Sequence, residues 1–376
     1  KGISAMSEKV FWCKNCLNMS TRPRITFDEK GWCNACQWME EKKVLDWSER
    51  EKELKVLLNK YRKDDGGYDC IVPVSGGKDG SYVAYILKHK YGMNPLTITS
   101  RPPLESEIGR VNIINFVESG YDHIHITPNK NAMSVLNKIG FIEMGFPYYG
   151  WLVSIFSVVT NIALKYDIPL IFYGEDGEIE YGGSSENKNR AIFDVEYMRR
   201  AYFEGGYDKI INKSDLNKKE LFWFSLPEKD QIKHKELFMT HMGYFEPWDS
   251  YKNYLVAKEH CGLQEAKENS SGTFTNFAQC DQSLVPLHQY MKYLKLGFGR
   301  ASQDVDIEIR RDAMTREQAV NLVKVYDGEY PEEYIEIYLD YYKMTMDEFN
   351  AVLDKWVNKD LFEKVNGRWK PLFVVK

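Results

Sequence analysis

The chain lacks the long apolar segments typical of membrane and secreted proteins. Its longest apolar run, Trp151–Leu164, spans 14 residues and includes polar residues such as Ser157. A membrane-spanning helix needs about 18 or more apolar residues, so this run predicts a buried helix. The start of the chain, KGISAMSEK, shows no apolar core of a secretory signal. We therefore expect a cytoplasmic protein with no membrane insertion.

Strong charge, internal repeats and low-complexity tracts are also missing. The formal net charge is only -5, with 50 Lys and Arg against 55 Asp and Glu. This balance does not favour binding to nucleic acid or to an anionic membrane, and we expect no nucleic-acid partner. The chain is 43% hydrophobic and 14% aromatic, which is enough to form a large core. Its length of 376 residues predicts two or three domains.

Cysteines are few, and their odd number, seven, is a poor fit to a complete disulfide framework. Four of them form two Cys-x2-Cys pairs: Cys13, Cys16, Cys33 and Cys36. This spacing matches a zinc pattern in which four thiolates surround Zn²⁺ and leave no open position, so the predicted zinc is structural. The alternatives are disulfides or chance. The remaining cysteines belong to no motif and are expected to be core or surface thiols: Cys70, Cys261 and Cys280.

From residue 68 onward, short apolar runs alternate with helical patterns. The predicted strands are DCIVPV, PLTITS, HIHIT, PLIFYG and, as a fifth, Glu236–Met242. The predicted helices between them are Ser81–Tyr91, Glu105–Ser119, Asn131–Ile142 and Trp151–Tyr166. This alternation predicts an α/β fold with a parallel, doubly wound sheet.

Four regions follow from these patterns. They are a zinc ribbon at 1–45, a linking helix at 46–66, an α/β domain at 67–260 and a mostly helical region at 261–376. Within the α/β domain, an insertion at about 178–235 is interpreted as a lid or substrate loop. The alternative is a helical hairpin without a functional role.

The first predicted strand ends in the sequence SGGKDGS, Ser75–Ser81. Gly76 and Gly77 let the backbone turn sharply, and the free amides at the start of the next helix form an anion site. Lys78 adds positive charge, whereas Asp79 would repel a phosphate and is suited to hold Mg²⁺. An ordinary glycine-rich turn is the alternative.

This loop does not match the Walker pattern. It resembles the SGGxDS signature of the PP-loop ATP-pyrophosphatase superfamily, whose fold is of the adenine nucleotide α-hydrolase type. The resemblance implies that Ser75–Ser81 bind the pyrophosphate end of ATP and that Lys78, Asp79 and Ser81 are catalytic. The chain departs from the signature at Gly80, where the superfamily has Ser. Ser81 follows one place later, so either Ser75 or Ser81 is the hydroxyl that reaches phosphate.

Other candidate residues lie after predicted strands or in the helical tail, because ligands of open α/β sheets bind at the carboxyl ends of strands. By analogy with the superfamily, Ser100 and Arg101 meet the adenosine. The acidic loop YGEDGEIEYGG offers a site for a cation or polar ligand, or is simply solvated. Its predicted ligand-binding residues are Gly174, Glu175, Asp176, Glu178 and Tyr181. Three arginines either clamp a diphosphate or carboxylate or are solvated: Arg300, Arg310 and Arg311.

A narrower resemblance covers most of the chain. The stretches CKNCLNMSTRPRITFDEKGWCNACQ, VPVSGGKDGS, YGEDGEIEYGG and GFGRASQDVDIEIRRDAMTREQA are similar to those of the N-acetyl sugar amidotransferases of surface-polysaccharide and nonulosonic-acid biosynthesis. The resemblance implies conversion of an N-acetyl group on a nucleotide-activated sugar to an acetamidino group, with ATP, Mg²⁺ and structural Zn²⁺.

The same resemblance implies that ammonia comes from a partner glutaminase through a barrel-shaped subunit, a pair resembling the histidine-biosynthesis subunits. No glutaminase nucleophile motif is visible in this chain, which agrees with an external source. Two other functions stay open. One is a tRNA-thiolation enzyme, which would need a basic RNA-binding face and a pair of working cysteines. The other is a zinc protein that binds a nucleotide without catalysis.

Overall fold

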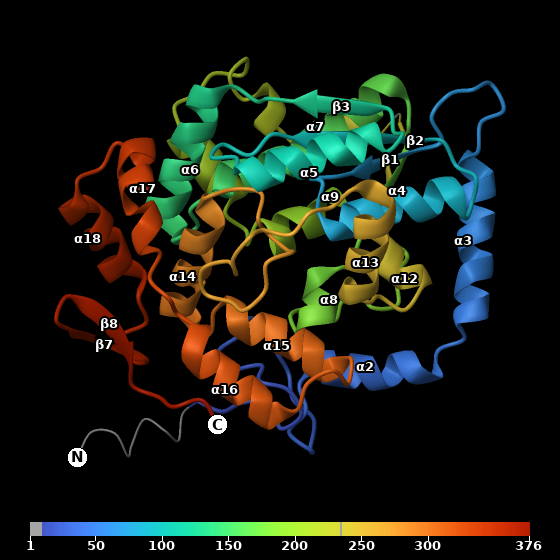
Figure 1. Ribbon diagram of the computed structural model, residues 1–376. Coiled ribbons are helices and arrows are strands. Elements are labelled where there is room, and N and C mark those ends of the chain that lie inside the picture. Colours follow the sequence, from blue (N-terminus) through green and yellow to red (C-terminus); the bar gives the residue numbers. More distant parts are fainter. Residues whose placement is uncertain (1–9, 234) are drawn as a thin grey trace.

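The computed structural model describes residues 10–233 and 235–376 and contains a six-stranded sheet at its centre (Figure 1). The strand order is β3-β2-β1-β4-β6-β5, and every pair is parallel except β5 with β6. The strands are β1 Cys70–Pro73, β2 Pro95–Ser100, β3 His123–Ile126, β4 Leu170–Tyr173, β5 Ile192–Phe193 and β6 Phe238–His241. All five predicted strands are confirmed.

Helices cover both faces of the sheet. The side chains of each strand alternate between the two faces, so one strand contributes to two cores. Ile71 of β1 joins a core with the helices α6 and α7, whereas Cys70 and Val72 join a second core with α4 and α5. The bounds are α4 Lys78–His89, α5 Glu107–Glu118, α6 Lys130–Met144 and α7 Tyr149–Tyr166. The predicted parallel, doubly wound fold is confirmed. None of the described helices is long and apolar enough to cross a membrane.

The region predicted as an insertion extends the sheet and its core. Its strand β5 pairs antiparallel with β6, and Phe203 and Phe224 are fully buried in the core that contains α7. The region is therefore an integral part of the sheet and its core, and its residue Tyr181 lines the cavity described below. Its other elements are α8 Gly177–Tyr181, α9 Val195–Tyr197, η1 Met198–Tyr202, α10 Tyr207–Lys213, η2 Phe222–Phe224 and α11 Lys229–Ile232.

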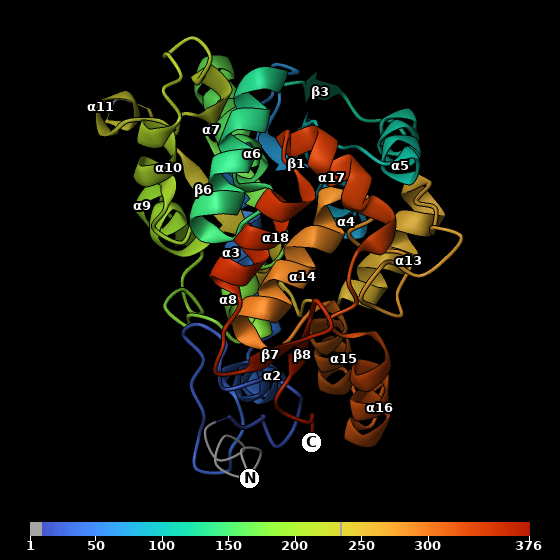
Figure 2. The ribbon, with the colours of Figure 1, turned by 90° about the vertical axis from the view of Figure 1, so that its left-hand side faces the viewer.

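The four-cysteine region packs against the C-terminal helices rather than standing alone. Figures 1 and 2 both show α2 (Asn34–Val44) beside α15 (Arg300–Arg310) and α16 (Arg316–Tyr326). The buried cysteines share a core with Val305 of α15 and Val323 of α16. Residues near the two ends of the chain therefore build one structural unit.

The rest of the C-terminal region packs on α6, where Phe141 is buried among its helices. The remaining elements are α3 Trp47–Tyr61, α12 Met242–Phe245, α13 Ser250–Cys261, α14 Leu284–Leu296, η3 Glu332–Tyr334, α17 Ile335–Tyr342, α18 Met346–Trp356, β7 Phe362–Val365 and β8 Arg368–Pro371. Between α13 and α14 lies a segment without helix or strand, residues 262–283, which we call the 262–283 segment.

Candidate functional site

The stretch Ser75–Ser81, which we call the phosphate loop, connects β1 to α4 by a turn that only glycine fits. Gly76 has φ +81°, and a Cβ atom there would lie 2.4 Å from the backbone nitrogen of Ile113 in α5. Gly77 is the N-cap of α4 and offers no side chain to the free amides of the first helical turn. These amides and the helix dipole are therefore available to an anion.

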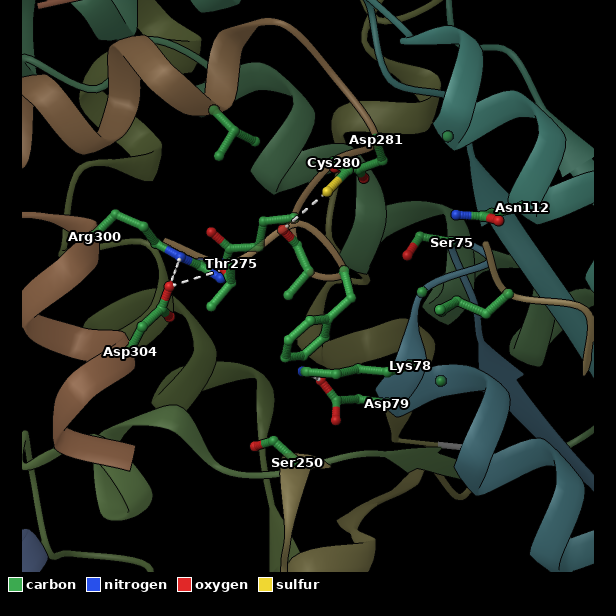
Figure 3. A pocket seen from close by; sticks show the side chains of 18 of the residues that line it. Ser75, Lys78, Asp79, Asn112, Ser250, Thr275, Cys280, Asp281, Arg300 and Asp304 are labelled. Atoms are coloured by element: carbon green, nitrogen blue, oxygen red, sulfur yellow. Dashed lines mark hydrogen bonds and ion pairs between the residues drawn. The ribbon is translucent and has the colours of Figure 1, made fainter. Parts of the chain in front are cut away.

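A cavity of about 310 Å³ opens beside this loop. Figure 3 shows Ser75 and Asn112 on one side of it and Arg300 with Asp304 on the other. Its lining comes from the phosphate loop, the starts of α5, α7 and α13, the end of β4, α15 and the 262–283 segment. The predicted site residues that line it are Ser75, Gly77, Lys78, Asp79, Gly80, Glu175, Tyr181 and Arg300.

Two carboxylates, Asp79 and Glu175, line the cavity near the start of α4. Asp79 forms an ion pair with Lys78, and its Oδ1 accepts a hydrogen bond from Asn253 at 3.0 Å. Glu175 accepts a hydrogen bond from the Tyr181 hydroxyl at 2.7 Å. Burial, and then the charge of Asp79, raise the pKa of Glu175 to about 7. Two oxygen ligands beside a phosphate-binding turn fit Mg²⁺, which prefers carboxylates together with substrate phosphates.

Ser81 does not line the cavity, which corrects its predicted catalytic role. Helix α4 begins at Lys78, so Ser81 lies on the buried side of its first turn with 0% of its surface exposed. Its Oγ has no hydrogen-bond partner among the described residues. Ser75 is exposed and lines the cavity. Of the two predicted hydroxyls, Ser75 is therefore the one placed to reach a phosphate.

This difference gives a testable prediction. We expect Ser75→Ala to raise the KM for ATP about tenfold, because a hydrogen bond to a charged group contributes roughly 1.5–3 kcal/mol. Ser81→Ala should leave KM and kcat unchanged, since it removes a buried hydroxyl that bonds to none of the described residues. Steady-state kinetics of ATP consumption measures both. An equal loss in the two variants would contradict this assignment.

The departure at Gly80 has a steric cause. A Cβ atom at Gly80 would lie 2.7 Å from the carbonyl oxygen of Pro73 and 3.1 Å from the Cα of Val74, so α4 and β1 are too close for a side chain. The superfamily serine is thus excluded at this position unless the backbone shifts.

We therefore expect Gly80→Ser, which restores the superfamily pattern, to lower the free energy of unfolding by about 1–3 kcal/mol. Gly177→Ser is the matched control, because a Cβ atom there meets only ordinary contacts of 3.4 Å or more. Urea denaturation measures the difference. If Gly80→Ser were as stable as the Gly177→Ser control, α4 and β1 would be able to move apart without loss of stability, which would contradict this explanation.

Ser100 and Arg101 also lie outside the cavity, contrary to the predicted contact with adenosine. Ser100 is buried, and its hydroxyl is hydrogen-bonded to Ser154 at 2.9 Å. Arg101 pairs with Glu105 and lines a separate groove with residues of the Thr127–Met133 stretch. The chain leaves β2 towards β3, as the hydrogen bond from the Arg101 amide to Ile126 shows, and this direction carries both residues away.

The acidic loop after β4 does not act as one site. Glu175 is the only one of its four carboxylates that lines the cavity, whereas Asp176 is the buried N-cap of α8. Glu178 forms two hydrogen bonds with the guanidinium of Arg24, at 2.7 and 2.8 Å. Glu180 pairs with Lys42 at 2.7 Å. Glu178 and Glu180 therefore attach the four-cysteine region to the end of the sheet. The structure thus does not place Asp176 or Glu178 where they could contact a ligand in the cavity.

Gly174 lies directly behind the cavity. A Cβ atom there would be 3.0 Å from the Trp248 ring and 3.4 Å from the Cβ of Asp79. The carbonyl of Gly174 accepts a hydrogen bond from the Gly243 amide at 3.1 Å. Its role is therefore to let the chain pass close to Asp79 rather than to touch a ligand.

Only one of the three predicted arginines reaches the cavity. Arg300 lines it, and its Nε donates to Asp304 at 3.0 Å. Arg311 does not line the cavity; it pairs with Asp249 and with Glu308, and only Glu308 belongs to the lining. Arg310 lies beside the four cysteines; burial lowers its pKa, but the charges of Cys16 and Asp306 outweigh burial and raise it. Arg310 and Arg311 therefore do not form the predicted clamp with Arg300.

Several residues of the cavity were not predicted from the sequence. Asn253 of α13 donates a hydrogen bond to Asp79 and is itself fully buried, but no helix was predicted there and no sequence signal pointed to it. Lining residues that no sequence pattern pointed to include Asn112, Tyr148, Trp151, Thr275, Phe277, Gln279, Cys280, Asp281, Gln303, Asp304 and Glu308.

The four predicted zinc ligands come together in a second candidate site. Their Sγ atoms lie within 4.8 Å of one another, all four side chains are fully buried, and no disulfide joins them. Hydrogen bonds from N–H groups reach the sulfurs, among them Asn18 Nδ2 to Cys33 at 3.4 Å and Asn15 Nδ2 to Cys36 at 3.3 Å. Four converging, buried thiols with such donors fit a metal ion or an iron–sulfur cluster.

Comparison with known proteins supports part of the predicted resemblance. Residues 271–375 match the family described as "LPS biosynthesis protein WbpG-like, C-terminal domain", where LPS is lipopolysaccharide. A stretch of 87 residues is 33% identical to MJ1599, an uncharacterized protein of Methanocaldococcus jannaschii, and covers 23% of this chain and 31% of that protein. The match thus spans about a third of its relative.

Among solved structures, the chain is similar to the U34-tRNA thiolase NcsA from Methanococcus maripaludis with its [4Fe-4S] cluster. That similarity has a TM-score of 0.36 and 15% sequence identity, over 76% of this chain and 80% of the other. It is too low to support a conclusion on function. The resemblance to surface-polysaccharide proteins is confirmed at the C-terminal region, which is similar to the C-terminal domain of WbpG-like proteins of LPS biosynthesis.

Proposed function

We propose that the chain is an ATP-dependent amidotransferase that converts the N-acetyl group of a nucleotide-activated sugar to an acetamidino group. One observation carries this proposal. The cavity beside the phosphate loop is closed by residues of the WbpG-like region, among them Thr275, Cys280 and Arg300. The part of the chain that is similar to LPS biosynthesis proteins therefore faces the part that resembles ATP pyrophosphatases.

ATP would bind with its terminal phosphates on the amides of the α4 N-terminus, beside Ser75 and Lys78. Lys78 is paired with Asp79 in the free protein and can turn to a phosphate once Asp79 has another partner. Asp79 and Glu175 would hold Mg²⁺, which neutralises charge on the departing pyrophosphate. Asn253 and Tyr181 keep the two carboxylates in place.

The proposed reaction activates an amide, which is otherwise a poor electrophile. The amide oxygen attacks the α-phosphorus of ATP, the bond to the β-phosphate breaks, and pyrophosphate leaves. Ammonia then attacks the carbon of the adenylated imidate, and AMP departs with the former amide oxygen. The product is an amidinium cation, and one proton is released. Tyr148, Trp151 and Phe277 line the same cavity and would limit access of water to the imidate.

Ammonia must arrive unprotonated, which is why we propose an external glutaminase that delivers it through a barrel-shaped partner subunit. We also propose that the four cysteines hold a structural Zn²⁺. The metal would fix the loop that carries Arg22 and Arg24 against the C-terminal helices, because the cysteines share a core with Val305 and Val323.

The alternative of tRNA thiolation finds less support in the cavity. That chemistry commonly uses a pair of cysteines near the adenylation site, and only Cys280 of the seven cysteines lines this cavity. Burial raises the pKa of the Cys280 thiol, which disfavours the reactive thiolate.

The direct test is mass spectrometry of a panel of nucleotide-activated N-acetyl sugars incubated with the protein, ATP, Mg²⁺ and ammonium. We expect one of them to become lighter as oxygen is replaced by NH, with AMP and pyrophosphate formed in equal amounts. Release of ADP, or AMP formation that requires tRNA, would reject the proposal. ATP binding without any turnover across the panel would favour the non-catalytic alternative.

A further inference from the structure

Three cationic side chains from distant parts of the chain converge near Phe298, two residues before the start of α15. Arg22 belongs to the loop between the two cysteine pairs, Lys292 to α14 and Arg300 to α15. The guanidinium carbon of Arg22 and the Nζ of Lys292 lie 5.7 and 5.5 Å from the centroid of the Phe298 ring. We call Arg22, Lys292 and Arg300 the basic cluster.

The basic cluster is connected to the cavity of the phosphate loop. Arg300 lines that cavity and is only 6% exposed. Lys292 donates a hydrogen bond to Gln303 at 3.1 Å, and Gln303 also lines the cavity. The cavity therefore has the phosphate loop on one side and Arg300 on the other, as the positions of Ser75 and Arg300 in Figure 3 show, whereas Lys292 and Arg22 lie behind its lining.

These cations have too few counter-charges around them. Arg300 pairs with Asp304 through Nε, which leaves its two terminal nitrogens without a hydrogen bond in the described part of the chain. Among the residues that the structure describes, the Nζ of Lys292 donates a hydrogen bond only to the neutral amide oxygen of Gln303. The guanidinium of Arg22 has no hydrogen bond or ion pair with any of residues 10–233 and 235–376. Arg22 and Lys292 are both partly buried, and burying an unpaired cation is costly.

The acids nearby already have other partners. Around Arg22 these acids are Glu178, which pairs with Arg24, and Asp306, which accepts a hydrogen bond from the Leu17 amide. Asp304 also accepts hydrogen bonds from Thr273 and Thr275. Asp327 accepts from the amide of Gly299 at 2.8 Å and from the hydroxyl of Ser302 at 2.7 Å. None of these acids forms an ion pair with Lys292 or Arg22 within the described residues. The cluster therefore keeps an excess of positive charge that an external anion can neutralise.

We propose that the basic cluster binds the diphosphate of a second, organic substrate, in the same cavity as ATP and at its opposite side. That the organic diphosphate is a nucleotide-activated sugar rests on the proposed function; the anion site itself does not. Bidentate contacts from two guanidinium groups and a point charge from an ammonium suit a diphosphate. The aromatic rings of Tyr148 and Trp151 line the cavity and offer apolar surface to a sugar.

This assignment replaces the arginine clamp expected from the sequence. Arg300 keeps its predicted role, but its partners are Arg22 and Lys292 instead of Arg310 and Arg311. A diphosphate held there would extend towards the phosphate loop, so the acetamido group of a sugar and the α-phosphate of ATP would share one enclosed space. Recognition and adenylation would then depend on both the four-cysteine region and the C-terminal helices.

The first test is isothermal titration calorimetry with the phosphate loop already filled. The full chain is saturated with Mg²⁺ and the non-hydrolysable analogue α,β-methylene-ATP and then titrated with UDP as the organic diphosphate and, separately, with inorganic pyrophosphate. We expect one further site for UDP, with an affinity lowered at least about tenfold in Lys292→Gln and in Arg22→Gln. Lys292→Arg should keep most of the affinity.

Lys324→Gln is the matched control, because Lys324 is exposed on α16 away from the cavity. It should bind UDP as the unmodified protein does. A UDP site that disappears once the ATP analogue is bound, or one that Lys292→Gln leaves unchanged, would overturn the proposal. Binding of pyrophosphate alone, without a gain from the nucleoside of UDP, would contradict an organic substrate.

A second readout separates a ligand site from a structural role. Burial, and then the charges of Arg22 and Arg300, lower the pKa of Lys292 to about 7. In the unfolded chain this lysine stays protonated up to about pH 10. Its buried charge therefore lowers the free energy of unfolding most below pH 7, and this destabilisation becomes smaller as the pH rises. The charged or titratable groups around it are Arg22, His288, Lys295, Arg300, Asp304 and Asp327.

Lys292→Gln should therefore raise the Tm of the free protein, and more at pH 6 than at pH 9. A variant with a lower Tm at both pH values would show that the lysine stabilises the fold, and would overturn the proposal. The proposed reaction can fail separately: UDP binding that depends on Lys292, in a protein that forms no AMP with any sugar, would keep the anion site and reject amidotransfer.

Discussion

Asp79→Asn is expected to abolish conversion of ATP to AMP, with a fall in kcat of about 10³-fold or more. Asp79 is the carboxylate at the start of α4, where an anion would meet the free amides. In the proposed function Asp79 is one of two oxygen ligands for Mg²⁺, so its replacement would weaken metal binding and would leave the repulsion between Glu175 and the phosphates unscreened. Loss of metal-based stabilisation costs several kcal/mol in the transition state, which corresponds to this factor.

The fold should survive this change, because Asn keeps the shape of Asp and can still contact Asn253. Pyrophosphate formation measures activity, and circular dichroism with thermal melting measures folding. Asp347→Asn is the matched control, since Asp347 also lies in the first turn of a helix but is exposed on α18. Full activity of Asp79→Asn would show that the metal and the phosphates are held elsewhere.

Cys33→Ser is expected to have the largest effect on stability. All four cysteines are buried, and their common core includes α15 and α16 as well as the N-terminal region. A structural metal contributes on the order of 10 kcal/mol to the folding of a small domain. We therefore expect loss of bound metal and unfolding of residues packed around the cluster at ordinary temperatures.

Metal analysis by inductively coupled plasma mass spectrometry, together with visible absorbance, measures this effect and identifies the metal. We expect one zinc for each chain in the unmodified protein and less than a tenth of that in Cys33→Ser. Cys280→Ser should keep the full amount, because Cys280 lies in the 262–283 segment, outside the cluster. Iron with visible absorbance in place of zinc would identify an iron–sulfur cluster and correct our assignment of the metal.

Local features of this molecule were predictable from the sequence, because neighbouring residues determine them. The strand β1, the glycines of the phosphate loop and the start of a helix follow one another within a few residues, and the two Cys-x2-Cys pairs define their own turns. The same local pattern could not show which way Ser81 points. That depends on α4 beginning at Lys78, three residues before the predicted start.

Residues whose partners are far apart in the chain could not be assigned in this way. Glu178 looked like a ligand in an acidic loop, but its partner Arg24 is 154 positions earlier. Arg22 and Lys292 meet at Phe298 only because the four-cysteine region packs on the C-terminal helices. The 262–283 segment has no periodic pattern, and yet it supplies much of the cavity wall.

The measurement that tests the central claim most directly follows the oxygen of the acetamido group. A substrate sugar labelled with oxygen-18 in its acetyl carbonyl is incubated with the protein, ATP, Mg²⁺ and ammonium, and the AMP is analysed by mass spectrometry. If the phosphate loop directs adenylation of the amide, each amidine formed releases one AMP that carries the label. Unlabelled AMP, with the label still in the sugar or in water, would contradict the account.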